Sequence, residues 1–113
     1  MACCEWPVSY HGTSSNNAKC IAKDGFEVSK GRRFLFGRGI YTTPDIEVAE
    51  KYAQVFKHEG NYYKVIIQNR VNPDPNRLQI ISKDKTGLGE YWVSKNNSDV
   101  RPYGIMLKEL VNN

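Results

Sequence analysis

The sequence predicts an α+β domain, because helical and extended patterns occupy different parts of the chain. Two short helical patterns, interleaved with extended segments, lie in the first half, and the second half is a run of strands. With 113 residues, the chain is the size of one domain and can bury enough surface for one hydrophobic core. We therefore expect a single domain that spans residues 1–113.

The chain is expected to open with a strand and a short helix. Residues 6–11 alternate apolar and polar side chains, as a strand does, and Gly12 is expected to end that strand. Ser14 or Ser15 can cap a short helix that Gly25 terminates.

The strongest helix signal is Thr43-Pro44-Asp45, which supplies a cap, a first-turn proline and a first-turn acid in succession. His58-Glu59-Gly60 is expected to close this helix. Its apolar face is formed by Ile46, Ala49, Ala53 and Phe56. Further strands are expected at residues 40–42, 61–69, 78–81, 90–93 and 100–110.

Composition and charge narrow the function classes. The net charge of +4 suits an anionic partner such as a dinucleotide or RNA, but no cluster of lysine and arginine is dense enough for a nucleic-acid-binding stripe. The sequence has no signal peptide and no apolar run of membrane-spanning length. An odd number of cysteines favours a reducing compartment. We expect an intracellular, cytoplasmic protein with no membrane partner, and a nuclear location stays open.

Four side chains are potential zinc ligands: Cys3, Cys4, Cys20 and His58. Their spacing does not match a zinc knuckle, and adjacent cysteines rarely chelate one ion together. We therefore expect free thiols and no metal site.

Three short patterns bear on function. In Tyr10-His11-Gly12-Thr13, a histidine at a strand end precedes a glycine whose backbone can approach a ligand. Gly37-Arg38-Gly39 permits a tight turn but lacks the third glycine of a dinucleotide-binding loop. Tyr41 and Tyr52 can form a slot that holds a flat cationic ligand by stacking and cation–π attraction. Each pattern alone also fits an ordinary turn or core.

In combination and in this order, the patterns resemble the catalytic domain of diphtheria-toxin-type ADP-ribosyltransferases, and within that group the poly(ADP-ribose) polymerase branch. Phe36-Gly37-Arg38-Gly39-Ile40-Tyr41 resembles the F-G-[KR]-G-I-Y element of that branch, and His11-Gly12-Thr13 resembles its H-G-[ST]. The resemblance extends from Trp6 to about Lys108. It implies an ADP-ribosyltransferase-like fold of split antiparallel β-sheets with short helices, too compact for a helical regulatory domain.

The resemblance also implies that NAD is the co-substrate and that four residues form the nicotinamide site. His11 would hydrogen-bond ribose hydroxyls, and the backbone of Gly12 would pair with the carboxamide of nicotinamide. Tyr41, as the second member of the catalytic triad, would form one wall of the nicotinamide slot. Tyr52 would form the opposite wall.

Other residues are assigned to the remainder of NAD by the same resemblance. Thr13 and Asn17 would help to hold the adenosine part. Arg32, with Arg33 as a second candidate, would supply positive charge to the pyrophosphate.

Two departures from the family pattern limit the expected chemistry. The family serine three residues before the helix tyrosine is Ala49 here. The late-strand glutamate, the third triad member in chain-elongating enzymes, is replaced; we place its position at Tyr103, with Ile105 as the alternative register. That carboxylate would stabilise the oxocarbenium-like transition state and activate an acceptor hydroxyl. Without it, polymer extension is not expected.

The sequence therefore predicts an NAD-dependent mono-ADP-ribosyltransferase, a pentosyl-transferring enzyme that modifies proteins, including itself, and uses His11, Tyr41 and Tyr103 in catalysis. One alternative is a catalytically degenerate module that binds NAD or ADP-ribose. Another is transfer onto a nucleic-acid end or an RNA 2′-phosphate, for which the candidate arginines are Arg32, Arg33, Arg38 and Arg101.

Overall fold

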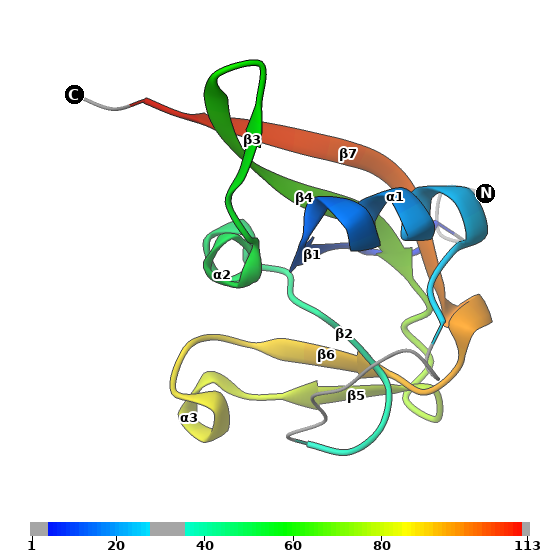
Figure 1. Cartoon of the computed structure of the whole chain (residues 1–113). Coiled ribbons are helices and arrows are strands. Elements are labelled where there is room, and N and C mark those ends of the chain that lie inside the picture. Colours follow the sequence, from blue (N-terminus) through cyan, green and yellow to red (C-terminus); the bar gives the residue numbers. More distant parts are fainter. Residues whose placement is uncertain (1–4, 28–35, 112–113) are drawn as a thin grey trace.

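The computed structural model describes residues 5–27 and 36–111, which form two antiparallel β-sheets and three short α-helices (Figure 1). This arrangement confirms the α+β class. In chain order the elements are β1 (Val8–Thr13), α1 (Ser15–Asp24), β2 (Ile40–Thr42), α2 (Ile46–Tyr52), β3 (Phe56–His58), β4 (Asn61–Val71), β5 (Leu78–Ile81), α3 (Lys83–Thr86), β6 (Tyr91–Ser94), the 3-10 helix η3 (Asn97–Asp99) and β7 (Val100–Leu110).

The larger sheet is built on the long strand β4. One edge of β4 pairs with β1 and β3, and the other edge pairs with β7, all antiparallel. The smaller sheet has the strand order β2-β6-β5. In Figure 1 the larger sheet lies above the smaller one, and the chain passes between them repeatedly. Residues distant in the sequence therefore meet where the two sheets face each other.

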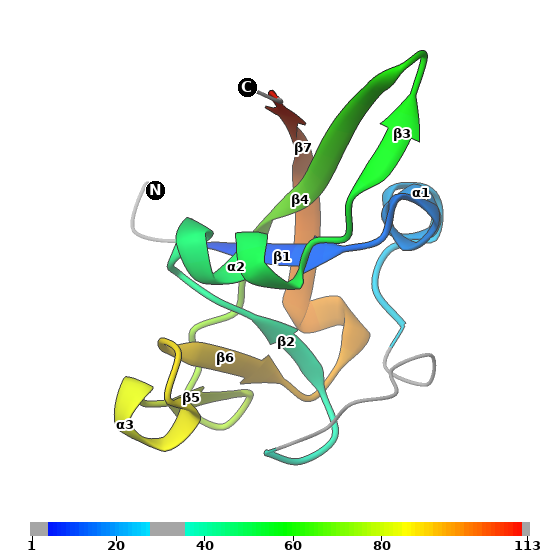
Figure 2. The ribbon, with the colours of Figure 1, turned by 60° about the vertical axis from the view of Figure 1, so that its left-hand side comes forward.

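The helices α1 and α2 pack on opposite faces of the larger sheet. Ile67 of β4 shares a buried cluster with Ala18 of α1, whereas its neighbour Ile66 packs with Ala49 of α2 and with Ala53, the C-cap of α2. Successive strand residues point to opposite faces, so each helix covers a different face. Figure 2 shows α2 lying across β1.

The main hydrophobic core brings together both sheets and α1. Its buried members are Ala18, Phe26, Ile40, Val65, Ile67, Val71, Leu78 and Val100. None of the helices within residues 5–27 and 36–111 has the length and hydrophobicity needed to cross a membrane.

A backbone bridge joins the two sheets. The Tyr10 N–H donates to the Thr43 carbonyl at 2.8 Å, and the Thr43 N–H donates to the Tyr10 carbonyl at 3.0 Å. The Thr43 hydroxyl also donates to the carbonyl of Glu90 at 2.7 Å, directly before β6. Through these hydrogen bonds, Thr43 links the end of β2 to β1 and to the residue before β6.

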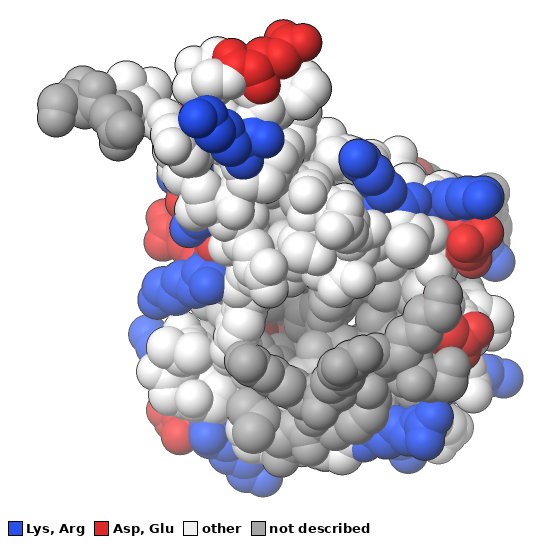
Figure 3. Space-filling view, viewed as in Figure 1, with Lys and Arg blue, Asp and Glu red and all other residues white. Residues whose placement is uncertain are grey.

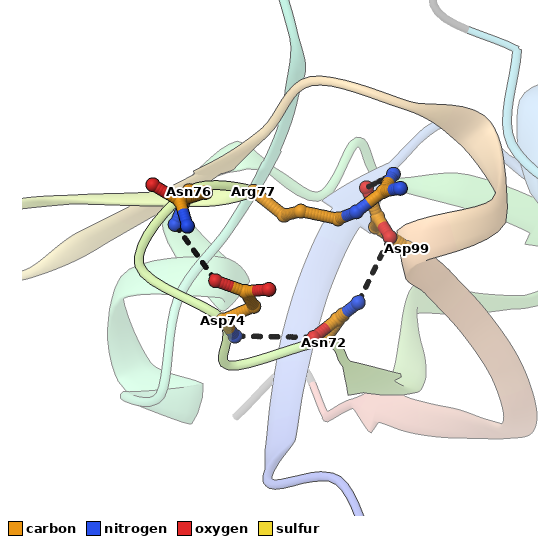
Figure 4. A network of polar contacts seen from close by, with 5 residues as sticks. All are labelled: Asn72, Asp74, Asn76, Arg77 and Asp99. Atoms are coloured by element: carbon orange, nitrogen blue, oxygen red, sulfur yellow. Dashed lines mark hydrogen bonds and ion pairs between the residues drawn. The ribbon is translucent and has the colours of Figure 1, made fainter.

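A polar network orders the turn between β4 and β5 and ties it to the start of β7 (Figure 4). The buried carboxylate of Asp99 accepts a hydrogen bond from the Asn72 amide at 3.1 Å and pairs with Arg77 at 3.3 Å. Within the turn, Asn72 accepts from the Asp74 N–H at 3.1 Å, and Asp74 accepts from the Asn76 N–H at 2.9 Å. These contacts fix the path of the chain from β4 into β5.

The predicted cap of α2 is wrong by two residues. Asp45 is the N-cap, and its carboxylate accepts from the Glu47 N–H at 2.9 Å. Thr43 is committed to the bridge between the sheets, and its hydroxyl accepts from the Asp45 N–H at 3.1 Å. The tertiary role of Thr43 thus displaces the local capping signal.

The predicted end of α2 is also wrong. The helix ends at Tyr52, and Phe56–His58 forms β3. Glu59 and Gly60 have positive φ angles of 50° and 85°, the geometry of a tight hairpin turn that folds β3 back onto β4. The ring of Phe56 packs against Tyr63, with ring centroids 5.8 Å apart. Pairing with β4 therefore overrides the helical pattern.

The short helices α3 and η3 were not predicted, and the remaining differences are small shifts at element ends. β1 begins at Val8 and continues through Gly12 to Thr13, because β4 is long enough to pair with all of it. Ser14 caps α1, and the Gly25 N–H bonds to the carbonyl of Ile21, as predicted.

Candidate functional site

A cavity of about 200 Å³ opens where β1, β2, α2 and β6 meet. Its lining residues are Tyr10, His11, Gly12, Tyr41, Thr42, Thr43, Val48, Ala49, Tyr52 and Tyr91. Pockets for drug-sized ligands usually measure about 300–1,000 Å³. This cavity therefore fits a single ring with a small substituent, and the remainder of a larger ligand would lie outside it.

The cavity lining is neutral and largely aromatic. Among the described residues that line it, none is a lysine, arginine, aspartate or glutamate. Among the residues coloured in Figure 3, charged side chains lie mostly around the periphery of this face. The lining therefore suits a flat, uncharged or cationic ring better than an anionic group.

His11 is oriented by β2. Its Nδ1 lies 2.7 Å from the carbonyl oxygen of Tyr41, which can only accept, so Nδ1 carries the proton and Nε2 is left as an acceptor. The ring packs edge-on against Phe26, with centroids 5.1 Å apart. Burial lowers the pKa of His11 below its usual 6.5, and the bond to Tyr41 only partly opposes this. The imidazole is therefore neutral at pH 7.

Gly12 has a structural role beside any role in binding. A Cβ at this position would lie 1.8 Å from the carbonyl oxygen of Ala49 and 2.8 Å from the backbone nitrogen of Ala53. Only glycine therefore lets α2 pack directly on β1 and close this side of the cavity.

The two glycines of Gly37-Arg38-Gly39 are also explained by the fold. Gly37 has a φ of 102°, which other residues rarely adopt. A Cβ on Gly39 would lie 2.8 Å from the carbonyl oxygen of Ser94 on β6. The segment thus turns and packs against β6, and it delivers Tyr41 to the cavity.

Tyr41, Tyr52 and Tyr91 are three of the four tyrosines that line the cavity. The Tyr41 hydroxyl accepts from the Phe36 N–H at 2.7 Å and donates to the Gly37 carbonyl, which fixes its ring. The ring of Tyr52 lies edge-to-face with that of Tyr91, with centroids 6.0 Å apart, and their hydroxyls are hydrogen-bonded. Burial raises the pKa of Tyr52, so its hydroxyl stays protonated.

Four residues chosen from the sequence therefore line one cavity: His11, Gly12, Tyr41 and Tyr52. Ala49, at the position of the family serine, lines it as well.

Thr13 and Asn17 lie outside the cavity lining. Thr13 is buried at the end of β1, and its carbonyl accepts from the Gln54 N–H at 3.2 Å. Asn17 is exposed in the first turn of α1, where its N–H donates to the capping hydroxyl of Ser14 at 3.2 Å. Both follow His11 closely in the chain, so they remain candidates only for a part of the ligand outside the cavity.

Tyr103 does not join His11 and Tyr41 in the cavity, since none of the described lining residues comes from β7. Instead, Tyr103 lies at an irregularity in the pairing of β7 with β4. Its ring lies 5.3 Å from the guanidinium of Arg70. In the sheet register, Ile105 aligns with His11 through Ile67. Ile105, the alternative position predicted for the missing glutamate, therefore lies in the same cross-strand row as His11.

Several sequence-chosen residues fall outside the described part of the chain: Arg32, Arg33, Cys3 and Cys4. Of the remaining zinc candidates, Cys20 is an exposed free thiol and His58 is exposed beside Glu59. Within residues 5–27 and 36–111, no three histidine, cysteine, aspartate or glutamate side chains are grouped as metal ligands.

Tyr91 and Thr42 are cavity residues that the sequence did not single out. Tyr91 opens an ordinary strand, and nothing in its local pattern marks it. Thr42 directly follows Tyr41 in β2. Because successive side chains of a strand point to opposite faces, the sequence predicts only that the Thr42 side chain points away from that of Tyr41.

No protein-family model matches the chain, and the search of curated proteins gives no significant match.

Proposed function

We propose that this protein is an NAD-dependent mono-ADP-ribosyltransferase that binds the nicotinamide of NAD in the cavity between β1, β2, α2 and β6. The observation that carries the proposal is the convergence of His11, Gly12, Tyr41 and Tyr52 on one small cavity. These residues come from three separate elements, β1, β2 and α2.

The cavity lining suits a positively charged pyridinium ring. Faces of tyrosine rings attract cations by about 0.5–2 kcal/mol each, depending on desolvation, and none of the described lining residues is a lysine or arginine that would repel a cation. The Gly12 backbone lies at the cavity wall, where it can pair with the carboxamide. The neutral Nε2 of His11 can accept a hydrogen bond from a ribose hydroxyl and hold the sugar next to the ring.

The reaction then follows from positioning. The bond between the nicotinamide nitrogen and ribose C1′ breaks, the electron pair stays on nitrogen, and neutral nicotinamide leaves an oxocarbenium-like ribose. A nucleophilic side chain of the acceptor forms the new bond at C1′ and releases its proton. Held reactants gain much of their rate from orientation alone.

The absence of a carboxylate among the described lining residues favours single transfer. Chain extension uses a weakly nucleophilic sugar hydroxyl, which needs a base, whereas a better nucleophile on a protein does not. The same observation, with Ala49 at the serine position, favours the binding-only module as a second candidate.

Nucleic-acid modification has weaker support. Arg101, one of its candidate arginines, lies over the ring of Trp6 at 4.4 Å, and no arginine is among the described cavity-lining residues.

Two substitutions of His11 test the proposal. The assay incubates each protein with NAD that is labelled in its ADP-ribose part and measures the label transferred to protein. An asparagine can keep the donor to the Tyr41 carbonyl but removes the Nε2 acceptor, whereas a glutamine can restore a group near the Nε2 position. We expect wild-type protein to become labelled, His11→Asn to lose labelling and His11→Gln to keep a measurable fraction.

The outcome separates the candidates. NAD binding by calorimetry without any labelling or nicotinamide release supports the binding-only module. A folded wild-type protein that neither binds NAD nor becomes labelled rejects both.

A further inference from the structure

We infer that the hydroxyl of Thr42 is a ligand-binding group of the cavity and supplies the side-chain hydrogen bond that Ala49 cannot make. This inference rests on the proposed function, because the ligand group in question is the neutral carboxamide of nicotinamide.

The first observation is a buried hydroxyl with no partner. Thr42 is only 4% exposed, and its Oγ1 has no hydrogen-bond partner among the described residues. Buried polar groups are nearly always paired, and each exception calls for an explanation. Thr43, the next residue, donates its hydroxyl to Glu90, so the local backbone does not prevent a threonine here from finding a partner.

The second observation is the position of Thr42. It lines the cavity together with Ala49 and His11. The bridge pairs Tyr10 with Thr43. Because the two segments run antiparallel, the residue after Tyr10 faces the residue before Thr43, so His11 lies opposite Thr42. Thr42, whose buried hydroxyl has no partner among the described residues, thus lines the cavity together with His11 and Gly12.

The chemistry of the lining defines the ligand group. A hydroxyl can both donate and accept, which matches the oxygen and the N–H of a carboxamide. No described lining residue carries a positive charge that would balance a carboxylate, and His11 is neutral at pH 7. The cavity should therefore select nicotinamide over nicotinic acid.

Other buried hydroxyls provide the matched control. Ser94 Oγ is also buried without a partner among the described residues, but Ser94 is not one of the lining residues. If unpaired hydroxyls in this fold merely hold internal water, Thr42 and Ser94 should behave alike when each hydroxyl is removed.

The test compares four proteins: wild type, Thr42→Val, Thr42→Ser and Ser94→Ala. For each protein, calorimetry measures the binding of nicotinamide and of nicotinic acid, and urea unfolding measures stability. Thr42→Val keeps the shape and removes the hydroxyl. We expect roughly two- to tenfold weaker nicotinamide binding, the effect of one neutral hydrogen bond. Stability without ligand should be equal or higher, because an unpaired buried hydroxyl is lost. Thr42→Ser and Ser94→Ala should keep wild-type affinity, and nicotinic acid should bind more weakly than nicotinamide.

Each other outcome overturns a distinct claim. If wild-type protein binds nicotinamide and Thr42→Val binds it equally well, Thr42 is not a ligand group but the proposed function stands. If Ser94→Ala loses as much affinity as Thr42→Val, the effect is indirect and the assignment to Thr42 is rejected. If wild-type protein binds neither nicotinamide nor NAD, the proposed function and the role of Thr42 both fail.

Discussion

Substitution of Gly12 by alanine tests how α2 is held on β1. The new Cβ would lie 1.8 Å from the Ala49 carbonyl oxygen, 2.8 Å from the Ala53 nitrogen and 2.9 Å from the Ala49 carbonyl carbon. All three obstacles are backbone atoms of α2 and its C-cap, so no side chain can rotate away. Forced overpacking of this kind costs about 1–3 kcal/mol. At about 4 °C for each kcal/mol in a domain of this size, the Tm should fall by roughly 4–12 °C.

Gly104→Ala is the matched control. Gly104 also lies in a strand paired with β4, and its new Cβ would lie 2.6 Å from the side-chain oxygen of Gln68. That atom is the end of a flexible chain and can move, so the cost should stay within about 0.5 kcal/mol. Thermal unfolding followed by circular dichroism measures both variants. Equal melting temperatures for Gly12→Ala and wild type would refute the close packing of α2 on β1.

Three further predictions follow from the site and the network. Tyr91→Phe removes the hydroxyl partner of Tyr52, so nicotinamide affinity measured by calorimetry should fall about two- to tenfold with little loss of stability. The lowered pKa of His11 means that only the unfolded state binds this proton just below pH 6.5. The free energy of unfolding should therefore decrease as the pH falls from 6.5 toward the folded-state pKa, and His11→Asn should remove this component of the pH dependence. Arg77→Met leaves the buried Asp99 carboxylate with fewer partners, which should cost about 1–3 kcal/mol in urea unfolding.

Each of these has a contrary result. A Tyr91→Phe variant with unchanged affinity would show that the pairing of hydroxyls does not hold Tyr52 in place. Identical pH profiles for wild type and His11→Asn would contradict a neutral, desolvated imidazole. An Arg77→Met variant as stable as Lys95→Met, a substitution of an exposed lysine, would show that the network in Figure 4 adds no stability.

Most of the strands were predicted well, because the alternation of apolar and polar side chains that marks a strand lies within the strand itself. β7 has the bounds expected from the sequence, and β5 and β2 do as well. The helix α2 was predicted too long and with the wrong cap, because the pairing of Phe56–His58 with β4 and the bridge at Thr43 are tertiary effects. Such pairings have no counterpart in the local sequence around each residue.

The candidate site was predicted in part for the same reason. His11, Gly12, Tyr41 and Tyr52 are marked by their motifs, and the structure brings them to one cavity. Tyr103 was predicted from the resemblance of residues 101–107 to the family strand, and it lies where the pairing of β7 with β4 shifts register, which the sequence pattern does not show. Tyr91 and Thr42 come to the cavity only through the packing of β6 and the bridge between the sheets, which no motif encodes.

The most direct test of the central claim is intact-mass analysis of the purified protein after incubation with NAD, with released nicotinamide quantified in the same sample. We expect mass increases of whole single ADP-ribose units, matched mole for mole by nicotinamide, with no ladder of longer chains at any one site. We also expect His11→Asn to stay unmodified. An unchanged mass for folded wild-type protein, or long chains on one site, would contradict the account.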